Sequence, residues 1–233
     1  MDRQRNTITY QDLLQKMHAL QDTTYRDFHK KLLKNDRLNL IGVRIPHLRA
    51  LAKEFKADVD YLLTFPDEYY EITFLKCAAT GMLPFGEFCK RVDVLVPLLD
   101  NWATCDCFRA PCIKKNREAF LPYLKNYLSD EREFVRRYGL VTLLSSYMTG
   151  EYLPLIFQSV TQCGDEPYYV MMAAAWLIAE VLTKFYEEGF SFMQQNAMPV
   201  KMHNRTIQKA CESYRLSPEQ KAQLKKLKRQ ATD

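Results

Sequence analysis

The chain has 233 residues, of which 47% are hydrophobic and 26% are charged, and this is the composition of a globular protein rather than a disordered one. It holds only 7 glycines and 10 prolines and contains no Asn-Gly or Asp-Gly pair, which argues against an all-β chain and favours helices. The 33 Lys and Arg residues exceed the 28 Asp and Glu residues, and the net charge of +5 is compatible with a polyanionic partner without requiring one.

Apolar residues recur at helical spacing almost throughout the chain, and no strand pattern interrupts them. The first helix is expected from residue 8 to about 22 and the second from 24 to 33, and a third has Pro46 in its first turn, where the missing N–H costs nothing. Short polar segments separate the other predicted helices, which span 59–64, 68–80, 85–99, 102–115, 118–128, 131–148, 152–162, 168–187, 190–195, 203–213 and 218–228.

No linker or low-complexity segment divides these helices, so we expect one all-α domain over residues 1–233. Helix pairs of this kind stack antiparallel into a curved solenoid with a concave groove, and the default for such a domain is a monomer. The segment 168–187 is apolar nearly all round, so it is expected between neighbouring helices, with Glu180 buried or facing the groove.

The seven cysteines are expected to be reduced thiols, because their number is odd and most lie in apolar helical patterns. Cys105, Cys107 and Cys112 are close in sequence, but residues two apart point to different helix faces and no histidine is near, so we expect no metal site. Residues 1–7 are not followed by an apolar signal segment, and no apolar run reaches membrane-spanning length. We therefore expect a cytoplasmic protein without a membrane partner.

Four residues stand out from this helical background. Trp102 and Asp106 are four residues apart, so they share one face of a helix. Arg137 follows Trp102 by 35 residues and Trp176 follows Arg137 by 39, steps close to the length of one helical-pair repeat. Residues that recur at the repeat period line up along one face of a solenoid.

Arg137 lies at the flank of the apolar stripe of its helix, which points it inward in preference to Arg136. A guanidinium in that position has to be paired or to face a groove. The residues alone leave two interpretations open: a structural ion pair of Arg137 with Asp106 or Glu180, and a functional site.

These segments resemble the AlkD-type DNA alkylation repair family, a group of HEAT-like-repeat DNA glycosylases. The resemblance covers nearly the whole chain in the same order, and it rests on IGVRIPHLR at 41–49, WATCD at 102–106, FVRR at 134–137, AAAW at 173–176 and NRTIQKA at 204–210. It implies HEAT-like repeats and a catalytic cleft formed by Trp102, Asp106, Arg137 and Trp176.

The resemblance also implies the chemistry: hydrolysis of the N-glycosidic bond of cationic N3- or N7-alkylated purines in duplex DNA, without base flipping and without a cofactor. A cationic base is already a good leaving group, so no general acid is needed and one carboxylate is enough. Asp106 would stabilise the sugar cation and orient water, Trp102 and Trp176 would pack against the deoxyribose and the base, and Arg137 would hold a phosphate.

Further cations are candidates for contact with the DNA backbone, because several fall at helix starts or at recurring repeat positions. They are Arg44, His47, Arg49, Lys53, Arg109, Lys114, Lys115, Arg136, Lys201, Arg205 and Lys209.

Two other functions remain open from the sequence. Cys107, Phe108 and Arg109 follow Asp106 directly, and the aromatic ring and the cation either line the cleft or plug it. With a plugged cleft, the chain would be a non-catalytic module that binds branched or distorted DNA, or a helical-repeat scaffold for another protein. The sequence motifs of phosphate-binding loops, dinucleotide-binding folds, serine hydrolases and zinc proteases are absent.

Overall fold

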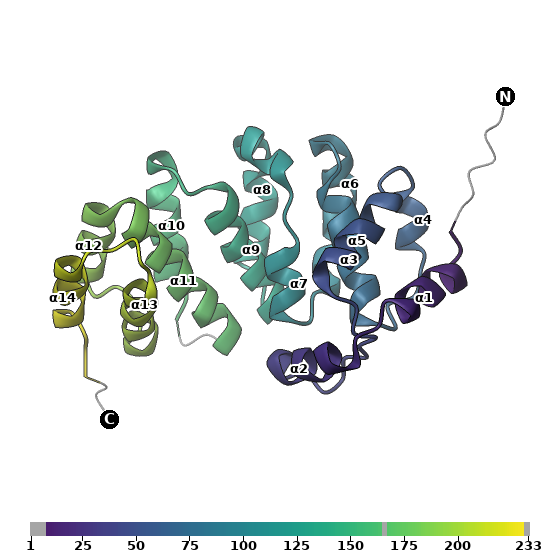
Figure 1. Ribbon diagram of the computed structural model, residues 1–233. Coiled ribbons are helices and arrows are strands. Elements are labelled where there is room, and N and C mark those ends of the chain that lie inside the picture. The colour runs from purple at the N-terminus through teal and green to yellow at the C-terminus, as the bar shows by residue number, and fades with distance from the viewer. Residues whose placement is uncertain (1–7, 165–166, 231–233) are drawn as a thin grey trace. The chain divides into compact units, whose positions relative to one another are not determined.

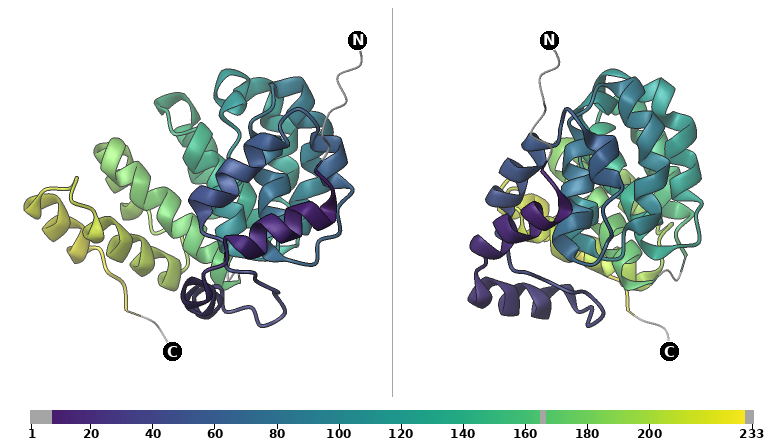
Figure 2. Two further views of the ribbon diagram at one scale, coloured as in Figure 1. Left: turned by 45° about the vertical axis from the view of Figure 1, so that its right-hand side comes forward. Right: turned by 90° about the vertical axis from the view of Figure 1, so that its right-hand side faces the viewer.

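The computed structural model describes residues 8–164 and 167–230, and within these ranges the chain is helical, with no β-structure beyond one isolated bridge between Gln21 and Val43. The predicted all-α, helical-repeat class is therefore confirmed. Figures 1 and 2 show successive helices packed side by side and joined by short connections. The absence of a signal segment predicted for residues 1–7 concerns a part of the chain outside the described ranges.

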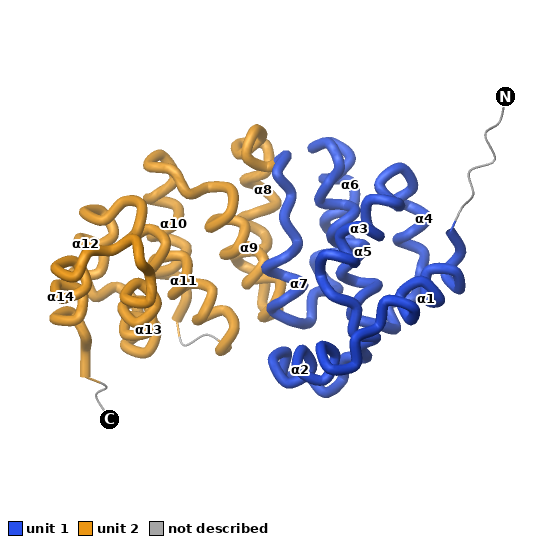
Figure 3. Tube along the Cα trace, viewed as in Figure 1, with its two compact units in different colours: residues 1–112 blue, residues 113–233 orange. Residues whose placement is uncertain are grey.

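The chain divides into two compact units, residues 1–112 and 113–233 (Figure 3). Each unit has its own buried centre and is treated by itself. The assignment of one domain to the whole chain stays a prediction.

Unit 1 is centred on helix α5, in which every residue from Tyr70 to Gly81 except Ala78 is buried. This helix packs against α3, α4, α6 and α7. The elements of unit 1 are α1 (Tyr10–Ala19), α2 (Thr23–Leu33), α3 (Ile45–Glu54), α4 (Val59–Leu63), α5 (Tyr70–Gly81), α6 (Phe85–Leu95), the 3-10 helix η1 (Val96–Leu98) and α7 (Trp102–Cys107).

Unit 2 is centred on helix α11, which packs against α9, α10, α12 and α13. The prediction that this apolar segment lies between neighbouring helices is confirmed. The 3-10 helix η2 (Pro111–Lys115) has its first two residues in unit 1 and the rest in unit 2. The other elements of unit 2 are α8 (Arg117–Leu128), α9 (Glu133–Ser146), η3 (Gly150–Tyr152), α10 (Leu153–Thr161), α11 (Tyr168–Lys184), α12 (Tyr186–Gln194), α13 (Val200–Glu212) and α14 (Pro218–Lys226).

The prediction of one continuous helix over residues 102–115 is wrong. Helix α7 ends at Cys107, and Phe108 has left the helical region with φ −75° and ψ 78°. Pro111 contributes to this ending, because a proline disfavours helical geometry at the residue before it, Ala110, and has no N–H to donate to the carbonyl of Cys107. The same residue starts the separate 3-10 helix η2.

The predicted helix 168–187 is also too long, because Phe185, with φ −137° and ψ 65°, separates α11 from α12. Helix α12 begins at Tyr186, so the helix predicted at 190–195 is its second half.

None of the helices in the described ranges is long and apolar enough to cross a membrane. Within the same ranges, the His, Cys, Asp and Glu side chains form no group of three that could hold a metal ion.

Candidate functional site

Helix α7 places Trp102 and Asp106 one turn apart on a short element that begins at a buried cap. The cap residue, Asn101, is 2% exposed, and its side-chain oxygen accepts a hydrogen bond from the backbone N–H of Thr104 at 2.9 Å. The Asn101 amide also donates to Oγ1 of Thr104 at 3.1 Å. An asparagine cap satisfies a free N–H group at a helix start in this way. The two hydrogen bonds to Thr104 therefore fix the first turn of α7.

Trp102 is half-buried and packs against the hydrophobic core of unit 1. Its indole Nε1 donates a hydrogen bond of 3.3 Å to the backbone carbonyl of Leu32, in the last turn of α2. This bond uses the indole's one donor and sets the orientation of the ring, which remains partly exposed.

Asp106 is half-buried, and its own backbone carbonyl accepts a hydrogen bond of 3.1 Å from Nε of Arg109. The segment after α7 is in turn held close to α5, since a Cβ atom added at Gly81 would lie 2.4 Å from the carbonyl oxygen of Arg109. Only a glycine permits such a close approach of backbone. The position of Asp106 therefore depends on contacts of α7 with α5.

Charged side chains gather around the C-terminal end of α7. Burial raises the pKa of the Cys107 thiol, the nearby cations of Arg49 and Arg109 lower it, and the charge of Asp106 raises it. Arg49, from helix α3, thus acts on the thiol of the residue that follows Asp106. Of the predicted DNA contacts, Arg109 bonds directly to the backbone of Asp106.

Arg137 lies on α9 in unit 2 and is only 6% exposed, whereas Arg136 is half-buried. The prediction that Arg137 is the inward-pointing arginine is confirmed. Its Nη1 donates to the carbonyl oxygen of Tyr169 at 2.7 Å, while the carboxylate of Glu133 accepts from the N–H of Tyr169 at 2.9 Å. The rings of Phe134 and Tyr169 lie 5.3 Å apart. One face of α9 thus holds the first turn of α11.

Trp176 is half-buried on α11, one turn before Glu180. The Glu180 carboxylate accepts two hydrogen bonds, of 2.7 and 2.6 Å, from the guanidinium of Arg215, and this pairing lowers its pKa. Glu180 was expected to be buried or to face a groove, and its pairing with Arg137 was left open. The structure corrects the burial and the pairing, because Glu180 is half-buried and forms an ion pair with Arg215. A position facing a groove stays a prediction. Arg215 lies beyond α13 and carries no motif that pairs it with Glu180 in sequence.

The structure therefore brings the four predicted catalytic residues together as two pairs. Trp102 and Asp106 share α7 in unit 1, and Arg137 and Trp176 lie on the adjacent helices α9 and α11 of unit 2. Assignment of all four to one cleft stays a prediction.

The predicted DNA contacts of unit 1 fall into two classes. Arg44 is exposed but already paired within the unit, because its guanidinium donates to one oxygen of Asp22 at 3.0 and 2.7 Å and lies 5.0 Å from the centre of the Tyr25 ring. The other four residues are exposed and lie on α3 or directly after α7, where a phosphate has access to them: His47, Arg49, Lys53 and Arg109.

The predicted DNA contacts of unit 2 differ in the same way. Arg136 is half-buried and donates to the carbonyl of Leu128 at 3.0 Å. Lys114, Lys115 and Lys201 are exposed. Arg205 and Lys209 are half-buried, four residues apart on α13, and bond to Gln208 at 2.9 Å and to Glu212 at 3.0 Å respectively.

The structure also contains a buried carboxylate that the sequence did not single out. Glu71 on α5 is 1% exposed and accepts hydrogen bonds from the backbone N–H groups of Ile41, Gly42 and Val43 at 3.1, 2.7 and 3.3 Å. Gly42 adopts φ +98°, and a Cβ atom there would lie 2.7 Å from the carbonyl oxygen of Asp22. The segment 41–43, which leads into α3, is thus fixed by one side chain. The only signal in the sequence is a single acidic residue within an apolar helix.

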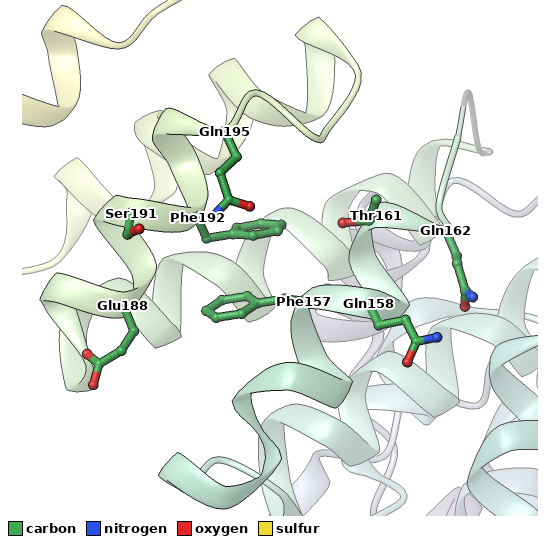
Figure 4. Close-up of a pocket in the computed structure, with 8 residues that line it drawn as sticks. All are labelled: Phe157, Gln158, Thr161, Gln162, Glu188, Ser191, Phe192 and Gln195. Carbon is green, nitrogen blue, oxygen red and sulfur yellow. The ribbon is translucent and has the colours of Figure 1, made fainter.

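Surface pockets in unit 2 lie mostly away from the predicted residues. The pocket in Figure 4 has a volume of about 460 Å³, lies between α10 and α12, and has the stacked rings of Phe157 and Phe192 on its wall, 4.4 Å apart. A second pocket, of about 570 Å³, lies between α8, α9 and α10 and is lined in part by Lys125 and Arg136. Neither contains Arg137 or Trp176.

Comparison with known proteins supports the resemblance seen in the motifs. A search of curated proteins found no match to the chain. A family model described as DNA alkylation repair enzyme matches residues 13–214, a range that includes all four predicted catalytic residues and every predicted DNA contact. The match spans well over half of the chain, and the chain therefore belongs to the DNA alkylation repair enzyme family.

Proposed function

We propose that this chain is a DNA N-glycosylase that releases cationic N3- or N7-alkylated purines from duplex DNA without flipping the base. Membership of a DNA alkylation repair family supports DNA repair as the general role, with DNA as the partner. The observation that carries the finer proposal is the pair on α7: Trp102 and Asp106 lie one turn apart on a helix whose start is capped by Asn101 and whose end is held against α5.

The reaction needs little from the protein, because the substrate base already carries a positive charge. When the bond between C1′ of the deoxyribose and the base nitrogen breaks, its electron pair goes to the base, which leaves as a neutral molecule. The sugar is left as an oxocarbenium ion, water adds to C1′, and the proton of the water passes to solvent. A general acid is not required, in contrast to the hydrolysis of ordinary glycosides.

Asp106 supplies the negative charge that this reaction uses. Its carboxylate stabilises the oxocarbenium ion and orients the attacking water, and the effect is strongest where little bulk solvent is present. The half-buried position of Asp106 suits this role, because the residue is partly surrounded by protein and partly exposed.

The tryptophans and Arg137 act on the rest of the nucleotide. The ring of Trp102, oriented by its bond to Leu32, and the ring of Trp176 pack against the deoxyribose and attract the cationic base. The guanidinium of Arg137 draws a neighbouring phosphate, and its bond to Tyr169 keeps the charge fixed on α9. We further propose that the protein acts as a cytoplasmic monomer.

Non-catalytic binding of distorted DNA is the second candidate, and Arg109 is the observation that favours it. The guanidinium of Arg109 bonds to the backbone carbonyl of Asp106, which places a cation close to the proposed catalytic carboxylate. A cation there reduces the charge that Asp106 offers to the sugar. In that case the same basic residues bind DNA and no base is released.

The test is release of free base from duplex DNA that carries N7-methylguanine, measured for the natural chain and for Asp106→Asn. Asp36→Asn is the matched control, because Asp36 is an exposed aspartate of unit 1 that is outside the motif. We expect release that Asp106→Asn abolishes, with DNA binding unchanged and Asp36→Asn fully active. Binding without release in the natural chain would instead establish the non-catalytic candidate, and equal release from both variants would remove Asp106 from the mechanism.

A further inference from the structure

Two pockets of unit 2 lie on opposite sides of helix α10. One, of about 460 Å³, lies between α10 and α12, and the other, of about 570 Å³, lies between α8, α9 and α10. Gln158 and Gln162 line both, so the two pockets adjoin each other over α10. Because Arg137 and Trp176 line neither pocket, this surface is separate from the proposed catalytic residues of unit 2.

The pocket between α10 and α12, here the apolar pocket, has an aromatic wall. The rings of Phe157 and Phe192 stack with their planes 11° apart, and Figure 4 shows Phe157 pointing from α10 toward Phe192. Phe157 is half-buried, so its ring is only partly covered. A cavity of about 150 Å³ is enough for a benzene ring, and this pocket therefore has room for one large apolar side chain. Exposed Glu188 also lines the pocket and repels a negatively charged group.

The pocket between α8, α9 and α10, here the basic pocket, attracts the opposite charge. Lys125 and Arg136 line it, and none of its lining residues in the described ranges is acidic. Nε of Arg136 donates to the carbonyl of Leu128 at 3.0 Å, which fixes the guanidinium at the pocket wall. The carboxylate of Asp130, just after α8, bonds to Arg132 at 2.7 Å. One carboxylate beside these three cations leaves positive charge in excess, which complements an acidic side chain.

The two glutamines between the pockets are spaced for a peptide backbone. Residues four apart on a helix are separated by about 6 Å along its axis. Alternate residues of an extended chain are separated by nearly the same distance, about 6.6–6.8 Å. An amide side chain both donates and accepts hydrogen bonds, as a peptide group does. The exposed side chains of Gln158 and Gln162 therefore suit every second residue of an extended chain that runs along α10.

The side chains of such an extended chain match the two pockets. Successive residues point to opposite sides, so a backbone that lies on the glutamines sends alternate side chains into the basic pocket and into the apolar pocket. The surface thus complements a sequence in which acidic and apolar residues alternate. It complements a nucleic-acid strand less well, because Glu188 repels a continuous line of phosphates.

We propose that α8, α10 and α12 form a docking groove for an extended segment of another protein, whose acidic side chains enter the basic pocket and whose alternating aromatic side chains enter the apolar pocket. In recognition of this kind, main-chain hydrogen bonds supply affinity and pockets for alternate side chains supply specificity. The inference goes beyond the proposed function and does not depend on it. It assigns Arg136 to a carboxylate of the partner protein in place of a DNA phosphate.

The first experiment uses the full chain and two end-blocked, fluorescein-labelled peptides. In one peptide three glutamates alternate with two phenylalanines, and in the other the same residues stand in two blocks, so composition and charge are equal. Fluorescence anisotropy measures binding. We expect saturable binding of the alternating peptide and about tenfold or more weaker binding of the block peptide, because only alternation fills both pockets at once.

Two matched pairs of variants test the pockets separately. Lys125→Glu reverses a charge of the basic pocket, and the control is Lys226→Glu, an exposed lysine of unit 2 that lines neither pocket. Ser191→Arg places a long side chain in the apolar pocket, and Gln194→Arg adds the same side chain to an exposed position of α12 outside it. We expect the two pocket variants to bind the alternating peptide about tenfold or more weakly and the controls to change affinity by less than about twofold.

A peptide with lysines in place of the glutamates separates recognition from misfolding. Lys125→Glu should bind this peptide more tightly than the natural chain does, and an unfolded variant cannot gain affinity in this way.

Four results would overturn the docking groove. They are a natural chain that does not bind the alternating peptide, equal binding of the block peptide, a Lys125→Glu variant that behaves like its control, and a single-stranded oligonucleotide whose binding Ser191→Arg weakens. The last result would assign the groove to nucleic acid. Failure of base release in the Asp106 experiment leaves the groove standing, and failure of peptide binding leaves the proposed catalysis standing.

Discussion

Gly81 and Gly86 lie five residues apart in unit 1, and a methyl group added at each is expected to change stability in opposite directions. At Gly81, the last residue of α5, a new Cβ atom would lie 2.4 Å from the carbonyl oxygen of Arg109 and 3.3 Å from its carbonyl carbon. At Gly86, near the start of α6, no heavy atom lies within 4 Å of the new Cβ atom. The two positions form a matched pair, because both are helical and neither has a positive φ.

The expected free energies follow from two opposing effects. Alanine in place of glycine stabilises a helix by about 0.5–1 kcal/mol, and this gain applies at both positions. The contact at Gly81 is shorter than any that real Cβ atoms make, and the opposing atom is backbone, so the segment after α7 has to move. Overpacking of this kind costs about 1–3 kcal/mol. Gly81→Ala should therefore destabilise unit 1 by about 1–2 kcal/mol, and Gly86→Ala should stabilise it by about 0.5–1 kcal/mol.

Urea unfolding followed by circular dichroism measures both differences, and base release by saturating enzyme shows whether the displaced segment matters for catalysis. We expect Gly81→Ala to slow release as well as lower stability, because the segment that it displaces is bonded to the carbonyl of Asp106. Equal stabilisation by both alanines would refute the reasoning, since the segment after α7 would then yield freely. A destabilised Gly81→Ala with a normal rate of release would separate the position of Arg109 from that of Asp106.

Three further perturbations test other parts of the structure. Glu71→Gln should lower the free energy of unfolding by about 1–3 kcal/mol in urea titrations, because an amide presents an NH2 group to backbone N–H donors. The control, Glu54→Gln, breaks only the exposed pair with Lys16 and should lower the free energy of unfolding by less than about 1 kcal/mol. Asn101→Ala should lower the free energy of unfolding by about 1 kcal/mol, because it removes the cap of α7. It should also reduce kcat for base release more than affinity for undamaged DNA, and a change in affinity alone would contradict the role given to α7. Burial lowers the pKa of both His29 and His203, so the unfolded chain binds more protons than the folded one, and stability should fall as the pH drops through about 6.5 towards the lower pKa of the folded state. Urea midpoints at several pH values, compared with those of a variant in which both histidines are phenylalanine, check this pH dependence, and equal slopes for the two proteins would exclude the histidines as its source.

The sequence predicted the helical class well because the apolar period runs almost unbroken and few glycines or prolines interrupt it. The errors occurred where tertiary contacts decide the local geometry. Pro111 ends the regular helix before it, yet the exact break at Cys107 also depends on the approach of Arg109 to Gly81, which lies 28 residues earlier. Likewise, the wheel geometry placed Arg137 inward, but it could not show that the partner would be the backbone carbonyl of Tyr169.

The same limit applies to the charged residues that surround the proposed site. Glu180 was expected at a groove because it lies one turn after Trp176, and its actual partner, Arg215, comes from a segment 35 residues away. Arg44 was expected to meet DNA; its guanidinium is paired with Asp22 and lies over the ring of Tyr25, and its contact with DNA stays a prediction. The sequence context of both residues does not reveal these ion pairs, because each partner lies more than 20 residues away along the chain.

Helix α7 shows why the proposed catalytic pair cannot be derived from helical spacing alone. A helix of six residues is too short to be stable by its own hydrogen bonds, so the i and i+4 relation of Trp102 and Asp106 exists only because other parts of unit 1 impose it. Asn101 fixes the start of the helix, the carbonyl of Leu32 fixes the indole, and the Arg109 segment fixes the end against Gly81. The positioning of the carboxylate is thus a property of the packed unit. Substitutions at these supporting residues should alter base release without removing any group that touches the nucleotide.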